Sequence, residues 1–458
     1  MLFPSQEKAK NKVLEYLNGK DNRPGIVVGP TGFGKSYLIS AVANEYKEPI
    51  LVLQPNKELL EQNLGKLELM GGKATVYSAS VGVKEASELT YATLGSIKNK
   101  VEVFKKLGVK TILVDECDHG YSPKEGSMFK KFINKLKPEK IVGYTATPFS
   151  LGVGYNKFGE SYSVLKMLNR QRPRIFKHFI DVVQIQDVIR DGRWSPLVYI
   201  THDFDTNELK FNTSGTEFTE QSVKKAVEAQ GVNNNIYLRL KTLLKDPTKN
   251  ILVFVDCVEN GEKMASLFKE AAFIGGETNK KERTKIINSF RNPKGKIRAV
   301  INHTVLTVGF DYPELNHIML GRPTNSLRLL YQKIGRGVRI HENKEKCYIE
   351  DFCGNIDRFG YVENLTIEDY PGYGWGIFNG DVLLTGVPLD APVKTTKKTL
   401  DEGQKDLMKI WFGKYKGTPL NQLSKRYLVY LAEWIDSLDK PSKNLIGLRS
   451  KIKNLMGV

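Results

Sequence analysis

Short apolar runs alternate with amphipathic runs along the first third of the chain. The strand-like runs, rich in Ile, Val and Leu, cover 25–30, 49–55, 110–116 and 139–148. Between them, 35–46 and 57–70 carry apolar residues at helical spacing. Short strands that alternate with helices are typical of a parallel sheet covered on both faces. The pattern therefore predicts an α/β domain over residues 1–150.

A second block with the same alternation follows a less regular stretch. Its strand and helix patterns lie at 250–270, 297–320, 326–340 and 346–352. This block predicts a second parallel-sheet domain over 236–365, and 151–235 reads as a connector with accessory strands. From 366 to 458 the pattern changes to Gly and Pro turns and then to a basic stretch, which we treat as a separate C-terminal accessory module.

Length and composition agree with this division. A chain of 458 residues exceeds one ordinary core, and 40% hydrophobic with 26% charged residues is a globular composition. The net charge of +18 favours a polyanionic partner such as nucleic acid, or serves solubility alone. Residues 391–458 hold 14 Lys and Arg against 6 Asp and Glu, an excess of +8.

The four cysteines form no CxxC pair, which argues against a disulfide framework or a zinc cluster and fits a reducing compartment. The start lacks an apolar signal core, and no run approaches the length of a membrane span. We therefore expect a soluble, cytoplasmic protein without a membrane partner, in the host cytoplasm if the chain is phage-encoded, and most simply a monomer.

Residues 29–36, GPTGFGKS, fit the phosphate-binding pattern G-x-x-x-x-G-K-S between a strand and a helix. Glycines let backbone N–H groups curl around phosphate oxygens, and the following helix N-terminus adds partial positive charge. Lys35 is expected to contact the β- and γ-phosphates, and Ser36 to place its hydroxyl on Mg²⁺. A chance Gly-rich turn is the alternative.

The run TILVDECDHG, 111–120, carries an apolar strand into acids, a thiol and an imidazole. Zinc ligands, a nucleophilic cysteine, a magnesium-binding carboxylate pair and a plain turn all fit it in isolation. The phosphate-binding loop favours the carboxylate pair, with Asp115 towards Mg²⁺ and Glu116 as general base on the attacking water. Zinc lacks further ligands at suitable spacing. Cys117 then reads as a packing residue, and His119 stays undecided.

The run QKIGRGVR, 332–339, places Arg336 and Arg339 three residues apart. On a helix such arginines point the same way and could clamp a γ-phosphate. An exposed basic helix face is the alternative.

Together these motifs resemble the superfamily 2 DExD/H-box helicases, over roughly residues 1–365. The matching stretches are 29–36 for motif I, 54–62 for Ia, 115–118 for II, 145–147 for III, 307–313 for V and 332–339 for VI. The resemblance implies two RecA-like domains in tandem that close on ATP and Mg²⁺.

The resemblance also implies individual roles. The ATP-binding set is Gln6, with Phe3 beside it, Gly29, Thr31, Gly32, Gly34, Lys35, Ser36, Gly309 and Asp311. The catalytic set is Lys35, Asp115, Glu116, Gln332, Arg336 and Arg339, and Ser36 and Asp115 hold Mg²⁺. Asp118, Thr145 and Thr147 couple hydrolysis to domain movement. Backbone contacts to nucleic acid fall on Asn56, Thr93, Ser96 and Thr304.

Some positions depart from the family pattern, including Lys57, His303 and Lys333, which puts single backbone contacts in doubt. The stretches at 54–62, 144–148 and 331–339 are more similar to DNA-directed branches than to DEAD-box RNA helicases, and those at 172–180, 188–197 and 350–360 resemble phage and bacterial helicases.

Residues 411–435 resemble a small module at the end of some exonucleases, which implies a small C-terminal α+β module over 366–458 that binds DNA. There Lys414 and Lys416 flank an aromatic ring, which suits contact with a phosphate backbone and stacking on bases. A small core with a basic edge fits the same stretch.

These features predict an ATP-dependent DNA helicase or translocase that remodels branched DNA, such as forks and Holliday-type junctions, in replication, recombination or repair. An RNA helicase of the same fold, or an ATP-gated nucleic-acid binding protein without unwinding, remains the alternative.

Overall fold

The structure is a computed structural model, and its described part contains the two expected sheets and a C-terminal helix. The described residues are 2–155, 161–213, 216–292, 294–303, 305–307, 312–370, 374–386, 423, 425–438, 445, 448–449 and 452–453. The predicted site residues Thr304, Gly309, Asp311, Lys414 and Lys416 lie outside this set. Among the described residues, no helix is both long and apolar enough to cross a membrane.

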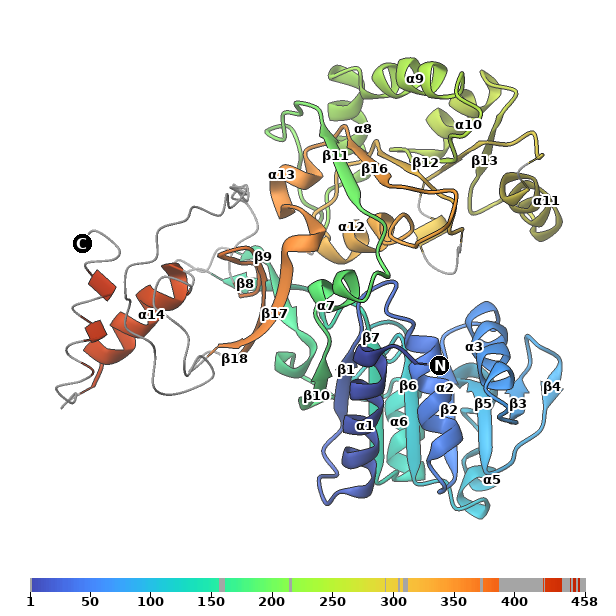
Figure 1. Ribbon diagram of the computed structural model, residues 1–458, viewed down its shortest axis with the longest axis vertical. Helices are drawn as coiled ribbons and strands as arrows, with labels where there is room; N and C mark the ends of the chain where they lie inside the picture. Colours follow the sequence, from blue (N-terminus) through green and yellow to red (C-terminus); the bar gives the residue numbers. More distant parts are fainter. Residues whose placement is uncertain are drawn as a thin grey trace.

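The first domain is built on an eight-stranded sheet that is parallel except at β4, which pairs antiparallel with β3. In sheet order the strands are β10 (His178–Val182), β1 (Gly25–Val28), β7 (Lys140–Thr145), β6 (Thr111–Asp115), β2 (Ile50–Gln54), β5 (Leu89–Thr93), β3 (Thr75–Ser78) and β4 (Val83–Lys84). Its helices are α1 (Pro4–Asn18), α2 (Lys35–Glu45), α3 (Lys57–Leu69), α4 (Leu94–Ile97), α5 (Val101–Lys106) and α6 (Met128–Leu136). The four predicted strands are thus present as β1, β2, β6 and β7 (Figure 1).

The second domain is built on a six-stranded, fully parallel sheet above the first in Figure 1. In sheet order its strands are β11 (Leu197–Thr201), β16 (Cys347–Asp351), β15 (His317–Leu320), β12 (Ile251–Phe254), β14 (Ala299–Asn302) and β13 (Ala271–Ile274). Its helices are α8 (Glu220–Ala229), α9 (Val232–Leu243), α10 (Val258–Ser266), α11 (Lys280–Arg291), α12 (Leu327–Ile334) and α13 (Asn355–Phe359). Two parallel α/β sheets in tandem confirm the predicted fold class.

Several helices start where a side chain accepts a backbone N–H, as helix N-termini require. The capping residues are Asn56 for α3, Ser127 for α6, Thr219 for α8, Asn279 for α11 and Ser326 for α12. Short 3₁₀ turns occur at Leu168–Arg170, Val305–Thr307 and Val362–Asn364.

The stretch predicted as a connector contributes to both sheets. β10 adds to the first sheet beside β1, and β11 adds to the second beside β16. Among the described residues of this stretch, the hairpin of β8 (Phe149–Tyr155) and β9 (Ser161–Met167) and helix α7 (Ile185–Arg190) stand apart from both sheets, and α8 already belongs to the helices of the second domain. Each of these strands lies at the edge of its sheet and pairs with backbone N–H and C=O groups of the neighbouring strand that would otherwise be exposed. A structural division at 150 and 236 therefore cuts through both sheets.

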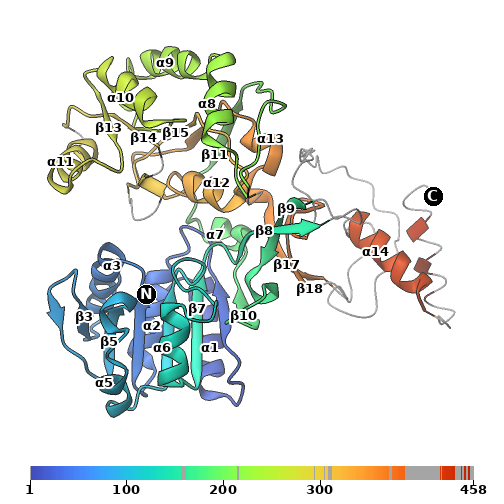
Figure 2. The same ribbon diagram turned by 180° about the vertical axis from the view of Figure 1, so that it is seen from behind.

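The chain after the second domain forms an antiparallel sheet where turns were expected. It consists of β17 (Leu365–Tyr370), β18 (Gly374–Asn379) and β19 (Val382–Leu383). Gln184, which precedes α7, pairs with both the N–H and the C=O of Ile367 at 3.1 and 2.7 Å. Helix α14 (Lys425–Asp436) follows, and its residues Tyr427 and Tyr430 pack on Tyr370 of β17, away from the two domains in Figure 2.

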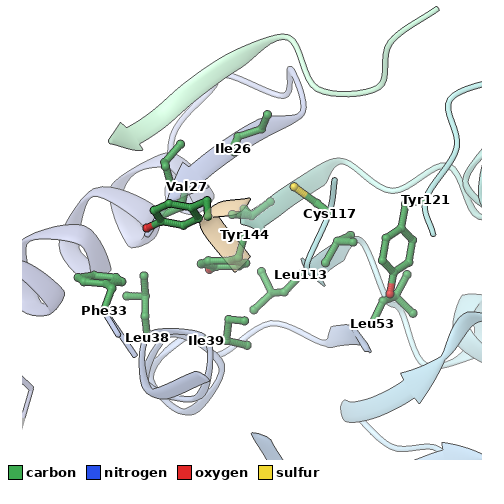
Figure 3. Packing of buried hydrophobic residues seen from close by; sticks show 14 of the residues in the cluster. Ile26, Val27, Phe33, Leu38, Ile39, Leu53, Leu113, Cys117, Tyr121 and Tyr144 are labelled. Carbon is green, nitrogen blue, oxygen red and sulfur yellow. The ribbon is translucent and has the colours of Figure 1, made fainter. Parts of the chain in front are cut away.

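The core of the first domain lies between its sheet and helices, as the labelled side chains in Figure 3 show. Cys117 belongs to this core, which confirms its prediction as a packing residue. Gly143 on β7 is required here because a Cβ atom would lie 2.6 Å from the ring of Phe176 and 2.7 Å from Sγ of Cys117.

Candidate ATP site

The phosphate-binding loop links the carboxyl end of β1 to the first turn of α2, as its sequence predicts. Gly32 and Gly34 adopt φ values of +82° and +79°, which glycine tolerates without steric cost. α2 begins at Lys35 directly after Gly34, so its unpaired N–H groups open towards the loop. This geometry forms an anion cradle at a helix N-terminus.

The two acids of motif II lie at the end of β6, opposite this loop. Asp115 is the last residue of the strand. Glu116 follows with φ +47°, a left-handed backbone conformation that is rare for residues other than glycine. Nζ of Lys35 lies 3.4 Å from Oε1 of Glu116. Strained backbone at such a position is typical of functional sites, and it aims Glu116 at the loop.

Asp115 is buried, and its Oδ2 accepts a 2.7 Å hydrogen bond from Nδ2 of Asn63. Burial and the neighbouring Glu116 raise the pKa of Asp115 to about 7, against the opposing charge of Lys35. A buried Asp115 beside a half-buried Glu116, whose charges repel each other, fits a divalent cation, and the half-buried hydroxyl-bearing Ser36 lies in the first turn of α2. Motif comparison missed Asn63, which lies one residue after the motif Ia match.

Asp118 connects three elements. Its carboxylate accepts hydrogen bonds from the hydroxyls of Thr145 and Thr147, both at 2.8 Å. The same carboxylate forms an ion pair with Nε of Arg328, on α12 of the second domain, at 2.9 Å. The structure thus brings the three predicted coupling residues together and adds Arg328, which sequence reasoning missed.

Gln6 lies on α1 against the phosphate-binding loop. Its Oε1 accepts the N–H of Phe3 at 3.0 Å, and its Nε2 donates to the carbonyl of Phe33 at 2.7 Å. Arg193 donates to the same carbonyl at 2.6 Å and lies over the ring of Phe3, 4.3 Å from its centroid. The predicted adenine-reading residue is therefore beside the loop, together with an arginine from the segment between the two sheets that the motifs did not reveal. The role of Gln6 in adenine recognition stays a prediction.

The motif VI arginines do not lie on a helix, contrary to the prediction. α12 ends at Ile334, so it carries Gln332, whereas Arg336 and Arg339 follow in a turn. Gly335 and Gly337 cause this turn to pack closely: a Cβ on Gly335 would lie 2.8 Å from Thr31, and one on Gly337 2.4 Å from Sγ of Cys347.

The turn still brings positive charge to the site. Burial lowers the pKa of Arg336 to about 10, while the carboxylate of Glu116 acts in the opposite direction. Glu116 of the first domain and Arg336 of the second are therefore close enough to interact electrostatically. Burial lowers the pKa of Arg339 to about 10 as well, with Arg291 adding to the effect.

The predicted nucleic-acid contacts of the first domain lie at the carboxyl ends of β2 and β5. Asn56 caps α3 by accepting the N–H of Leu59 at 2.9 Å. The hydroxyls of Thr93 and Ser96 lie 2.9 Å apart, and Ser96 also accepts the N–H of Ala79 at 2.8 Å. These groups are organised by local hydrogen bonds, and their contact with a nucleic acid stays a prediction.

Comparison with protein families matches both halves of the chain. Residues 1–150 match the family described as type III restriction enzyme, res subunit, and 235–341 match the helicase conserved C-terminal domain. The putative mitochondrial ATP-dependent helicase irc3 of Schizosaccharomyces pombe is 26% identical over 387 residues, covering 80% of this chain and 59% of the relative. The ATP-dependent DNA helicase uvsW of Enterobacteria phage T4 is 23% identical over 354 residues, 73% of this chain and 65% of the relative.

Comparison with solved structures supports the fold. A fragment of a putative HsdR subunit of a type I restriction enzyme from Vibrio vulnificus superposes with a TM-score of 0.57 at 19% identity, covering 78% of this chain and 66% of that one. The chain spans between half and two thirds of the length of the first curated relatives that it matches.

Proposed function

Because the chain belongs to the superfamily 2 helicases, we propose that it is an ATP-dependent DNA helicase or translocase that remodels branched DNA. One observation carries the proposal: the phosphate-binding loop faces the motif II acids and is in contact with the motif VI turn of the second domain. Lys35 and Glu116 lie 3.4 Å apart, and a Cβ on Gly335, directly before Arg336, would lie 2.8 Å from Thr31 of the loop.

The chemistry follows from the positions of the side chains. Lys35 and the N–H groups at the start of α2 bind the β- and γ-phosphates of ATP. Glu116 orients a water molecule in line with the γ-phosphate and accepts its proton. Arg336 and Arg339 stabilise the negative charge that develops on the transferred phosphoryl group. Because these groups come from both domains, hydrolysis requires the domains to be closed.

Ser36 and Asp115 would hold Mg²⁺, which when bound neutralises the charge of the phosphate oxygens. Asn63 keeps the Asp115 carboxylate in place by its 2.7 Å hydrogen bond.

DNA is the proposed polymer for two reasons. The net charge of +18 favours a polyanion, and a relative over 73% of this chain is named as a DNA helicase. Branched DNA is the proposed substrate because the sequence stretches at 172–180 and 350–360 resemble phage and bacterial helicases of the DNA-directed branches, which include fork-reversal and branch-migration enzymes.

The test compares ATP hydrolysis and strand separation on forks, four-way junctions, plain duplex, single-stranded DNA and single-stranded RNA. We expect hydrolysis to be stimulated most by forked and four-way DNA, and Glu116→Gln to abolish turnover while ATP still binds. Stimulation by RNA but not by DNA would establish the RNA helicase alternative. Equal activity on plain duplex and on junctions would remove branched DNA from the proposal.

A further inference from the structure

One residue of the phosphate-binding loop, Thr31, is held through both of its backbone polar groups. The N–H of Thr31 donates to the phenolic oxygen of Tyr331, on α12 of the second domain, at 3.0 Å. The carbonyl of Thr31 accepts the indole N–H of Trp194, in the segment that joins the two sheets, at 2.7 Å. We call these three residues the Thr31 clasp.

The clasp is tightly packed around the loop. Trp194 and Tyr331 are buried, with 7% and 3% of their surface exposed. A Cβ on Gly32 would lie 3.0 Å from Nε1 of Trp194, and one on Gly335 would lie 2.8 Å from Cγ2 of Thr31. The loop therefore touches the joining segment on one side and the motif VI turn on the other.

The joining segment continues from the clasp to the arginine turn. The N–H of Ser195 donates to the carbonyl of Val338 at 2.7 Å. Val338 directly precedes Arg339 in the chain. Trp194 and Ser195 are therefore neighbours that bind the phosphate-binding loop and the arginine turn, respectively.

We propose that Tyr331 and Trp194 are positioning residues that hold the phosphate-binding loop in its ATP-competent form only while the domains are closed. When the second domain moves away, the N–H of Thr31 loses its acceptor and the loop peptide is free to rotate. The closed domains and the ATP-competent loop then form one state, and the open domains and the relaxed loop form the other. A variant that populates the closed state less binds ATP more weakly. This inference rests on the proposed ATPase function and deepens it.

The packing alone does not require the polar atoms of the clasp. A phenylalanine at 331 would fill nearly the same space as the tyrosine and would lack the acceptor for Thr31. Tyr144 offers a matched control, because it is equally buried in the first domain and its hydroxyl has no hydrogen-bond partner among the described residues. Tyr331→Phe and Tyr144→Phe thus remove the same atom from a clasp and from a plain core position.

The experiment measures Tyr331→Phe, Trp194→Phe, Tyr144→Phe and the double variants in the full chain. We expect Tyr331→Phe to raise KM for ATP by about three- to tenfold with kcat unchanged within about twofold, the size of one hydrogen bond. Tyr144→Phe leaves both unchanged. Because Tyr331 and Trp194 bind the two adjacent peptide groups of Thr31, their combined effect on KM is non-additive, whereas Trp194→Phe and Tyr144→Phe add.

Two measurements without turnover complete the test. The dissociation constant of a fluorescent, non-hydrolysable ATP analogue rises in Tyr331→Phe by the same factor as KM. Small-angle X-ray scattering of the nucleotide-free protein gives a larger radius of gyration for Tyr331→Phe, which a saturating analogue restores.

The proposed role of the Thr31 clasp is refuted if Tyr331→Phe and Tyr144→Phe have the same KM for ATP, the same affinity for the analogue and the same radius of gyration. A wild type that hydrolyses no ATP would refute the proposed function, and scattering and analogue binding would still decide on the clasp.

Discussion

At the scale of single residues, Asn63 links α3, which begins directly after the predicted nucleic-acid contact Asn56, to Asp115, the proposed Mg²⁺ ligand. It lies on α3, whose N-terminus is capped by Asn56, and its amide donates to Asp115 at 2.7 Å. Its side chain is fully buried, so no water replaces this donor if it is removed. Asn63 therefore stabilises the charged form of the Asp115 carboxylate, which burial destabilises.

Asn63→Leu tests this support. Hydrogen bonds to charged groups contribute about 1.5–3 kcal/mol, so we expect the Mg²⁺ concentration for half-maximal ATP hydrolysis to rise about tenfold or more. Asn234→Leu, on the exposed side of α9, is the control and leaves the Mg²⁺ dependence unchanged. An unaltered Mg²⁺ titration in Asn63→Leu would mean that Asp115 needs no support from α3.

The sequence could predict Lys35, Asp115 and Glu116 because each belongs to a motif whose spacing is set by a strand, a turn and a helix. Asn63, Arg193 and Arg328 belong to no such motif. Each meets its partner only after folding, at separations such as 52 residues for Asn63 and Asp115. Nothing local in the chain distinguishes these side chains from other polar residues on helices and turns.

At the scale of secondary-structure elements, close packing around β7 makes a glycine necessary. A Cβ at position 143 would clash with the ring of Phe176 and Sγ of Cys117. Overpacking of a core costs typically about 1–3 kcal/mol, so Gly143→Ala should lower the free energy of unfolding by that amount.

Urea denaturation followed by circular dichroism measures the effect. Gly65→Ala on α3 is the control of opposite sign, because its added methyl meets no atom within 4 Å and alanine favours the helix by about 1 kcal/mol. Equal midpoints for the two variants would refute the packing argument.

One buried acid of the second sheet pairs with side chains from β15, from the residue after β11 and from helix α9. Glu350 on β16 lies 2.9 Å from Nε2 of His317 on β15, 3.1 Å from Nε2 of His202 and 2.9 Å from Nε of Arg239. Burial lowers the pKa of His317 below its ordinary 6.5, more than the Glu350 carboxylate raises it. Burial alone would raise the pKa of Glu350, but the hydrogen bonds from His317 and Arg239 lower it below 4.5.

Both shifts make the folded protein less stable in acid. The unfolded chain takes up a proton at His317 as the pH falls through 6.5, and the folded chain does so only at lower pH. The stability is therefore lost as the pH falls below 6.5, and Glu350 adds to the loss below 4.5. His317→Gln should flatten the decrease in melting temperature between about pH 7 and pH 5, whereas the exposed His119→Gln should not. Parallel melting curves for both variants would contradict this account.

The motif VI arginines illustrate which element boundaries the sequence hides. Apolar spacing over 326–340 suggested a helix through Arg336 and Arg339, yet the helix ends before both. Gly335 and Gly337 end it because their missing side chains allow contact with Thr31 and Cys347. Such contacts join residues far apart in sequence, so periodicity alone cannot reveal them.

At the scale of the whole molecule, the sequence predicted two tandem sheets but not how the chain crosses between them. β10 and β11 are short and mostly half-buried, and although 197–200 is apolar throughout, an apolar run does not tell which sheet a strand joins. Their assignment depends on which sheet edge lies nearby in space. The same holds for β17 and β18, where Phe179 of β10 packs against Trp375 at 4.9 Å between ring centroids.

The ion pair between Arg328 and Asp118 provides a mechanical link between the two domains. Arg328 is 24% exposed and the Asp118 side chain fully buried, so the pair is shielded from solvent on one side. Breaking the pair leaves Asp118 with its two threonine hydrogen bonds inside the first domain, and removes only the connection to α12. Arg328→Gln should therefore separate hydrolysis from movement.

We expect Arg328→Gln to retain ATP hydrolysis without DNA within about threefold and to lose about tenfold or more of strand separation per ATP hydrolysed, as coupling energies of about 1–3 kcal/mol imply. A fluorescent fork and a phosphate-release assay on the same samples give this ratio. Arg190→Gln removes an exposed ion pair on α7 and should leave the ratio unchanged, because exposed pairs contribute little. If Arg328→Gln instead lowers hydrolysis and unwinding in proportion, the pair serves closure of the ATP site and not the transmission of movement.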